Sequence, residues 1–124
     1  MPTLLSEAMV RRSLSGPLPG ERAHARMAVQ PRHLAADLDR DTPPRAGAVL
    51  ILLYPRGGTL YLPLTLRAET VAYHKGQVSL PGGAREATDA SLWDTALREA
   101  HEEVSIDPSQ VEFVGALSKV YISR

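Results

Sequence analysis

The sequence contains no cysteine and no excess of either charge. The absence of cysteine excludes disulfide bonds, thiolate zinc sites and cysteine nucleophiles, and it fits a reducing compartment. Lysine plus arginine and aspartate plus glutamate number 14 each, so no overall field draws the chain to nucleic acid or to an anionic membrane. Neither is expected as a partner, and any phosphate must bind at a local site.

Long apolar segments are also missing. No run approaches the roughly 20 apolar residues that span a bilayer, and the N-terminus lacks the apolar stretch of a signal peptide. The expected location is therefore the cytoplasm. Hydrophobic residues make up 44% and charged residues 23% of the 124 residues, which is typical of a folded soluble protein with a single core.

Local patterns divide the chain into an N-terminal region, residues 1–45, and a core domain, residues 46–124. Apolar spacing predicts a short amphipathic helix over residues 3–13. Several prolines between residues 16 and 45 predict an extended arm that wraps the domain, with room for a short helix near residues 32–39.

The core domain begins with a pattern of strands. Residues 46–55 form a nearly continuous apolar run, the pattern of a strand buried on both faces. A turn signal at residues 56–58 then predicts a hairpin with a second strand over 59–67. Pro63 cannot donate to a strand ladder, so this strand should lie at an edge or be bulged there. The glycine-rich stretch that follows leaves room for a short strand at residues 78–80.

Residues 91–104 follow helical periodicity, and either Asp89 or Ser91 is suited to cap the helix start. One side of this helix is apolar and consists of Trp93, Ala96, Leu97, Ala100 and Val104. Two further strands are predicted over residues 111–117 and 119–123.

The opposite side of this helix is acidic. Glu99 and Glu103 lie one turn apart with Glu102 beside them, so three carboxylates should converge. Such like charges repel, and a divalent cation would remove the repulsion; oxygen ligands favour Mg²⁺ or Mn²⁺ over zinc. A solvated acidic face is the alternative. The pattern R-E-x-x-E-E, beginning at Arg98 and preceded by Gly82-Gly83, makes coincidence rare.

Residues 82–106, GGAREATDASLWDTALREAHEEVSI, resemble the Nudix box, G-x5-E-x7-R-E-U-x-E-E-x-G-U, where U is a bulky apolar residue. Asp89 stands where the box has its first Glu, and eight residues rather than seven separate it from Arg98. This longer spacing is similar to that of the coenzyme A pyrophosphatase subgroup. Ser105 replaces the final Gly, which shapes the helix end.

The resemblance implies an α/β fold, the Nudix α/β/α sandwich around a mixed β-sheet. It also implies that Glu99 and Glu103 bind Mg²⁺ or Mn²⁺, that Glu102 is a further ligand or holds metal-bound water, and that Gly83 contributes a backbone carbonyl. Arg98 would orient carboxylates such as Glu102 or Asp89. Glu99, Arg98 and Glu102 thus form the expected catalytic set.

The implied reaction is attack by metal-activated water on a diphosphate phosphorus. The general base is either a glutamate of the box or a residue on a later loop.

Upstream of the box, residues 64–83 read LTLRAETVAYHKGQVSLPGG and are similar to the coenzyme A pyrophosphatase signature L-L-T-x-R-[SA]-x3-R-x3-G-x3-F-P-G-G. Pro63, Ala72 and Leu80 depart from it; His74 or Lys75 could replace the missing Arg at position 72. The matching positions are Leu64, Thr65, Arg67, Ala68, Gly76, Pro81, Gly82 and Gly83. The expected substrate-binding residues are Arg67, Gly76, Gln77, Gly82 and Gly83.

The function implied is hydrolysis of coenzyme A or acyl-CoA to 3′,5′-ADP and (acyl-)4′-phosphopantetheine, with a small coenzyme A-like nucleotide as the partner. Two alternatives are hydrolysis of another nucleoside diphosphate derivative, such as ADP-ribose, and an inactive Nudix-fold binding module. Arg67 could also be an exposed strand-end cation and Gln77 a loop cap. His74 and His101 are interpreted as a loop residue and a solvent-facing helix residue.

The resemblance further implies more strands and a second packing helix after residue 124, so the C-terminal part of the domain is expected to be missing. The sheet would then leave an apolar face or an unpaired edge in solvent, which favours a homodimer or aggregation.

Overall fold

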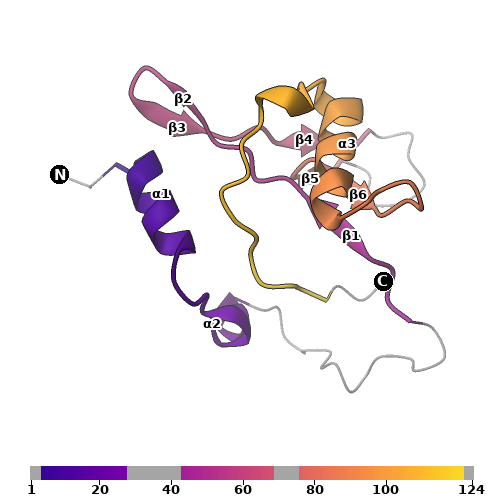
Figure 1. The fold of residues 1–124 in the computed structure, drawn as a ribbon, viewed down its shortest axis with the longest axis horizontal. Coiled ribbons are helices and arrows are strands. Elements are labelled where there is room, and N and C mark those ends of the chain that lie inside the picture. Colours follow the sequence, from indigo (N-terminus) through magenta and orange to yellow (C-terminus); the bar gives the residue numbers. More distant parts are fainter. Residues whose placement is uncertain (1–3, 28–42, 69–75, 122–124) are drawn as a thin grey trace. The chain divides into compact units, whose positions relative to one another are not determined.

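The computed structural model describes residues 4–27, 43–68 and 76–121 (Figure 1). The chain forms two compact units. The core unit comprises Arg45–Glu112 together with the first five residues, and the second unit comprises Ser6–Pro44 and Phe113–Arg124. None of the helices in the described segments has the length and apolar character needed to cross a membrane.

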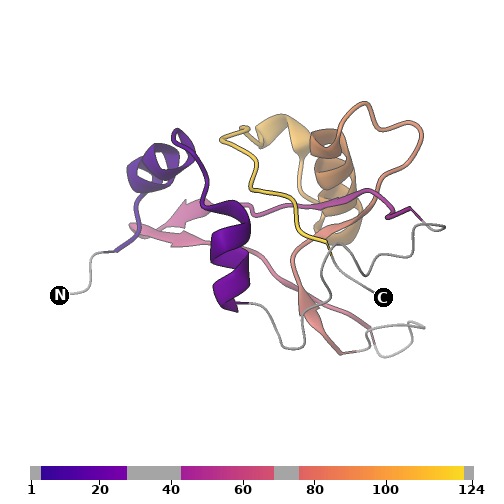
Figure 2. The ribbon, with the colours of Figure 1, turned by 90° about the horizontal axis from the view of Figure 1, so that it is seen from below.

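The centre of the core unit is a helix packed on a pair of strands. Strand β1 (Gly47–Val49) pairs antiparallel with β6 (Gly82–Ala84), and helix α3 (Leu92–Val104) lies against both, as Figures 1 and 2 show. The apolar side of α3 supplies the contacts, as its periodicity predicts. The buried hydrophobic side chains are Leu50, Ala96 and Ala100, and those packed against them are Ala48, Leu52, Trp93, Val104 and Ile106.

The described part of the core unit also contains two further antiparallel pairs. Strands β2 (Tyr54–Arg56) and β3 (Thr59–Tyr61) form the predicted hairpin. Its turn is Gly57-Gly58, and both residues have a positive φ, 58° and 78°, the conformation that a tight two-residue hairpin turn requires. Strand β4 (Thr65–Leu66) pairs with β5 (Val78–Ser79).

Several strand predictions are corrected. The run 46–55 is not one strand, because β1 ends at Val49 and β2 begins at Tyr54. The strand predicted over 59–67 is split into β3 and β4, with Pro63 in the gap as its missing N–H leads one to expect. Residues 111–117 and 119–121 form no strand, since no neighbouring strand is paired with them among the described residues. The mixed α/β class is confirmed.

Helix α3 begins and ends as the sequence predicts. Ser91 is the N-cap, and its side chain accepts a hydrogen bond from the Asp94 N–H at 3.2 Å, which decides between Ser91 and Asp89. Ser105 ends the helix in the left-handed conformation, with φ 57° and ψ 31°. A short 3-10 helix, η2 (Pro108–Gln110), follows, with Asp107 as its N-cap.

In its described residues, the second unit contains two short helices. Helix α1 (Glu7–Leu14) starts at the N-cap Ser6 and matches the predicted N-terminal helix. Helix α2 (Gly20–Met27) overturns the prediction of an extended arm for this stretch. Its nearby prolines, Pro17 and Pro19, precede its first residue, where a missing N–H costs no helical hydrogen bond. The helix predicted near 32–39 lies outside the described residues.

Candidate active site

Arg98 on α3 binds a buried aspartate with one edge of its guanidinium group. Its Nε and Nη2 atoms each lie 3.0 Å from one oxygen of Asp89, whose side chain is 5% exposed. Asp89 also accepts hydrogen bonds from the Thr95 hydroxyl and the Glu86 N–H, both at 2.9 Å. Hydrogen bonding to Arg98 holds the pKa of Asp89 well below its ordinary value, and the same contact raises the pKa of Arg98.

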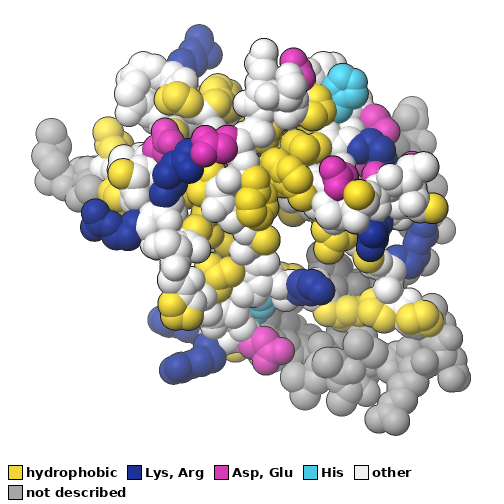
Figure 3. Space-filling model, in the orientation of Figure 1, with side chains coloured by type: hydrophobic (Ala, Val, Ile, Leu, Met, Phe, Trp, Pro, Cys, Tyr) yellow, Lys and Arg dark blue, Asp and Glu magenta, His cyan; other side chains and the backbone are white. Residues whose placement is uncertain are grey.

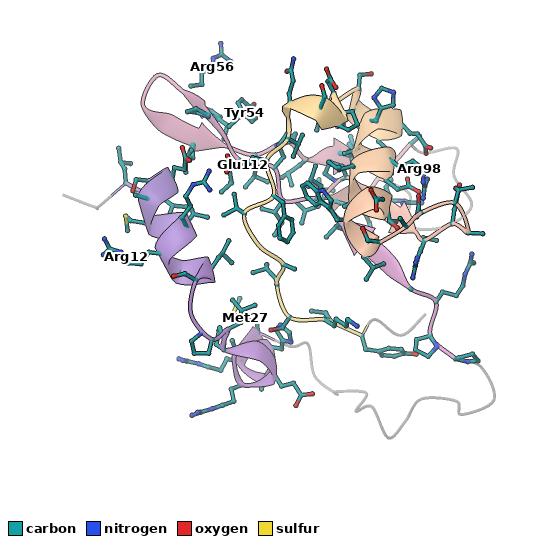
Figure 4. All side chains as sticks on the ribbon, in the orientation of Figure 1. Arg12, Met27, Tyr54, Arg56, Arg98 and Glu112 are labelled. Atoms are coloured by element: carbon teal, nitrogen blue, oxygen red, sulfur yellow. The ribbon has the colours of Figure 1, made fainter. Side chains whose placement is uncertain are left out.

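The remaining donors of Arg98 reach the acidic side of the helix and the end of β6. Nη1 lies 3.0 Å from Glu99 and 3.4 Å from Glu102, and Nη2 donates to the Ala84 carbonyl at 3.0 Å. The Glu86 carboxylate is 3.5 Å from Nη1. Figure 4 labels Arg98 at this position, and Figure 3 shows acidic and basic side chains side by side over α3. Arg98 therefore contacts both Asp89 and Glu102, the two carboxylates that the sequence predicts.

Glu99 lies directly above the backbone of Gly83. A Cβ atom at Gly83 would lie 2.5 Å from the carboxyl carbon of Glu99 and 2.5 Å from one of its oxygens. Such a distance is too short for any side chain, so a glycine is required if Glu99 is to keep this position. The double-glycine stretch thus brings the backbone and a carboxylate into close contact.

Glu103 faces a different part of the core unit. Burial raises its pKa, and the negative charges of Glu99 and Glu102 act in the same direction. Hydrogen bonding from the Gly82 backbone and the positive charge of Arg67 oppose this shift. Glu103 and Arg67 line one open hollow, whose full lining is Thr65, Leu66, Arg67, Ala68, Ser79 and Glu103.

Backbone pairing brings the predicted substrate-binding residues of the β4–β5 pair together. The Arg67 N–H donates to the Gln77 carbonyl at 2.9 Å, and the Gly76 N–H donates to the Arg67 carbonyl at 3.1 Å. Gly76 has a φ of 66°, which favours glycine there. The predictions for Ala72, His74 and Lys75 fall outside the described residues.

A family model described as the NUDIX domain matches residues 44–124. The chain belongs to the Nudix family. Nudix hydrolase NudL of Enterobacter sp. (strain 638), described as uncharacterized, is 46% identical over 87 residues, which are 70% of this chain and 45% of that protein.

Two eukaryotic Nudix relatives give further matches. The peroxisomal coenzyme A diphosphatase NUDT7 of Mus musculus is 47% identical over 70 residues, 56% of this chain and 30% of that protein. Nudix hydrolase 15, mitochondrial, of Arabidopsis thaliana is 43% identical over 84 residues, 68% of this chain and 30% of that protein. The chain therefore spans less than half the length of each of these relatives.

Nudix hydrolases act on phosphorus-containing anhydrides with divalent metal ions. The carboxylates of Glu99, Glu102 and Glu103 can therefore be compared with what a metal site requires. In the segments that the structure describes, no three acidic or histidine side chains are gathered as a ligand set. The metal site predicted at these three carboxylates therefore stays a prediction. Glu99 and Glu102 both form ion pairs with Arg98, which relieves their repulsion. The chemistry of the donors still fits, because Glu99, Glu102 and Glu103 belong to one helix and, with the Gly83 carbonyl, offer the hard oxygen atoms that Mg²⁺ and Mn²⁺ prefer.

Sequence reasoning missed two residues that contribute to this Nudix site. Thr95 and the Glu86 N–H complete the shell of Asp89, and Glu86 also faces Arg98. Periodicity gives no signal for them, because their role depends on how the loop before α3 folds. His101 is exposed, as predicted, but its Nδ1 lies 2.9 Å from the Ile106 carbonyl and closes the helix end.

Proposed function

We propose that this Nudix protein hydrolyses the pyrophosphate bond of coenzyme A or acyl-CoA, giving 3′,5′-ADP and (acyl-)4′-phosphopantetheine. The observation that carries this proposal is the shared hollow of Arg67 and Glu103. Arg67 belongs to the coenzyme A pyrophosphatase signature and Glu103 to the Nudix box, and the two motifs meet there. The name of the mouse relative, a coenzyme A diphosphatase, supports the same substrate.

In this proposal Glu99, Glu102 and Glu103, with the Gly83 backbone, hold Mg²⁺ or Mn²⁺. The bound ion would activate water and neutralise charge on the phosphoryl oxygens. The elements of the core unit would belong to a Nudix α/β/α sandwich around a mixed sheet.

The protein's own residues would position these groups. Asp89 fixes Arg98 through two hydrogen bonds, and Arg98 in turn holds Glu99 and Glu102 on one side of α3. Glu102 has a side chain that is 54% exposed, whereas that of Glu99 is 17% exposed, so Glu102 is the more accessible to solvent. Arg98 is therefore a positioning residue for two of the three carboxylates.

The substrate would lie along the β4–β5 pair. Arg67 would bind a phosphate through charge-assisted hydrogen bonds, which are stronger than neutral ones. Gly76 and Gln77 are tied to Arg67 through the backbone and would shape the approach to it. The positive charge of Arg67 acts on Glu103, so a phosphate held by Arg67 would lie beside the proposed metal ligands.

The test compares hydrolysis of coenzyme A and ADP-ribose by the purified protein with Mg²⁺ or Mn²⁺. We expect a higher kcat/KM for coenzyme A, a loss of orders of magnitude with Glu103→Gln, and no change with Glu21→Gln, an exposed glutamate of α2. Hydrolysis of neither compound, or full activity in excess chelator, would contradict the proposal.

A second candidate is hydrolysis of another nucleoside diphosphate derivative such as ADP-ribose. It is favoured by Ala72, which stands where the coenzyme A signature has an arginine. A preference for ADP-ribose that persists in Ala72→Arg would favour this candidate.

A further inference from the structure

A second hollow lies at the start of β1 and the end of β6. It has a volume of about 380 Å³ and opens to solvent. Its lining consists of Arg45, Ala46, Arg85, Glu86 and Ala87, and we call it the arginine hollow. Two of its five lining residues are arginines, so its chemistry suits an anion.

The backbone fixes Arg85 opposite Ala46, the chain neighbour of Arg45. The Arg85 N–H donates to the Ala46 carbonyl at 2.9 Å, which continues the β1–β6 ladder by one hydrogen bond. The Arg85 side chain is also anchored, because its Nη2 donates to the carbonyls of Asp89 and Ala90 at 3.2 and 3.4 Å. One nitrogen of the guanidinium group therefore holds the loop, and Nη1 and Nε keep their donors for a ligand.

The charge in the arginine hollow is positive. Within the described segments, no carboxylate forms an ion pair with Arg45 or Arg85. Glu86 is the acidic residue of the lining, and its carboxylate lies 3.5 Å from Arg98 and shares that charge. Two guanidinium groups without carboxylate partners match a phosphate dianion, which accepts several charge-assisted hydrogen bonds at once.

The arginine hollow adjoins the candidate active site. Both chain neighbours of Arg85 contact Arg98: the Ala84 carbonyl accepts from it at 3.0 Å, and the Glu86 carboxylate faces it. The hollow of Arg67 and Glu103 is formed by other elements, β4, β5 and the end of α3. Among the described residues, Arg67 therefore supplies a positive charge at the β4–β5 pair, and Arg45 and Arg85 supply positive charge in the separate arginine hollow.

We propose that the arginine hollow binds a phosphate monoester of the substrate, separate from the diphosphate that is cleaved. The proposal rests on the proposed function for the source of this group, because coenzyme A carries a phosphate monoester on its ribose. Arg45 and Arg85 would then contribute to the choice of nucleotide without taking part in the bond cleavage.

The experiment is calorimetric titration of the metal-free protein with 3′,5′-ADP, 5′-AMP and inorganic phosphate. Since each charge-assisted hydrogen bond contributes measurably to affinity, we expect 3′,5′-ADP to bind about tenfold more tightly than 5′-AMP. Arg45→Gln should remove this preference while it leaves the affinity for 5′-AMP unchanged. Arg56→Gln is the matched control, because Arg56 lies at the β2–β3 hairpin and its loss changes the net charge equally (Figure 4).

Arg85→Lys is a second variant, which keeps the positive charge but loses the planar guanidinium group. Its unfolding temperature shows whether the loop is still stable without the hydrogen bonds from Arg85 to the carbonyls of Asp89 and Ala90. An equal effect of Arg45→Gln and Arg56→Gln, or no preference in the wild type, would overturn the proposal. Inorganic phosphate that binds as tightly as 3′,5′-ADP would show a site for free phosphate instead. Coenzyme A hydrolysis by the wild type is measured separately. If the wild type prefers 3′,5′-ADP and Arg45→Gln removes this preference, but coenzyme A is not hydrolysed, only the proposed function is contradicted. If coenzyme A is hydrolysed but the wild type shows no preference for 3′,5′-ADP, only this inference is contradicted.

Discussion

Replacing Ser105 by glycine should stabilise the protein. Ser105 has the one positive φ, 57°, among the non-glycine residues that the structure describes, and its N–H donates to the carbonyls that end α3. An L-residue in this conformation costs about 1–2 kcal/mol, whereas a glycine costs roughly 0.5–1 kcal/mol through the entropy of the unfolded chain. The difference predicts that Ser105→Gly raises the free energy of unfolding by about 0.5–1 kcal/mol.

Urea unfolding measures this change, and Ala87→Gly is the control. Ala87 is exposed in a turn and has no positive φ, so glycine there adds only unfolded-chain entropy and should lower the stability. For Ser105→Gly we expect a higher urea midpoint with an unchanged slope, and a melting temperature raised by about 2–6 °C. If Ser105→Gly is as destabilising as Ala87→Gly, the backbone at Ser105 is not strained and the reasoning fails.

Three further results are expected. Asp89→Asn should destabilise the protein most near pH 7. Because the pKa of Asp89 is lowered in the folded state, its stabilising charge is fully present above its ordinary pKa of about 3.9 and is lost as the pH falls towards the folded-state value. The difference in the free energy of unfolding between wild type and variant, measured in urea, should therefore shrink in acid. A difference independent of pH would contradict this. Gly83→Ala should displace the flexible Glu99 carboxylate rather than unfold the chain. Mn²⁺ binding, measured by electron paramagnetic resonance, should then weaken by about tenfold. Unchanged Mn²⁺ binding would refute this prediction. Excess chelator should abolish coenzyme A hydrolysis, and added Mg²⁺ should restore it.

Helix α3 and the hairpin could be predicted because their signals are local. The apolar period, the cap at Ser91 and the Gly57-Gly58 turn each act within a few residues. The strands predicted over 111–117 and 119–123 relied on β-forming residue types, but a strand also needs a partner edge, and the described residues supply none there. Several prolines between residues 16 and 45 predict an extended arm, but Pro17 and Pro19 precede the first residue of helix α2 and so do not interrupt it.

Some contacts of the candidate site could also be predicted from the sequence, and others could not. The contact between Arg98 and Glu102 follows from their spacing of one helical turn, and it could be predicted from sequence. The approach of Arg67 to Glu103 depends on how the β4–β5 pair lies relative to α3, and only the family resemblance pointed to both residues. The arginine hollow gave no sequence signal, because its lining comes from the segment before β1 and the segment after β6, which meet only when the two strands pair.

The departure of this chain from the usual Nudix box at Asp89 has a structural explanation. Aspartate is one methylene shorter than the glutamate of the box, and one additional residue separates it from the arginine. Asp89 nevertheless receives two donors from Arg98, and the Glu86 N–H and the Thr95 hydroxyl bind the oxygen that lies near Nη2. The longer loop therefore brings the shorter carboxylate to Arg98. Because Arg98 also holds Glu99 and Glu102, this loop sets the position of two of the proposed metal ligands, although it contributes no ligand itself.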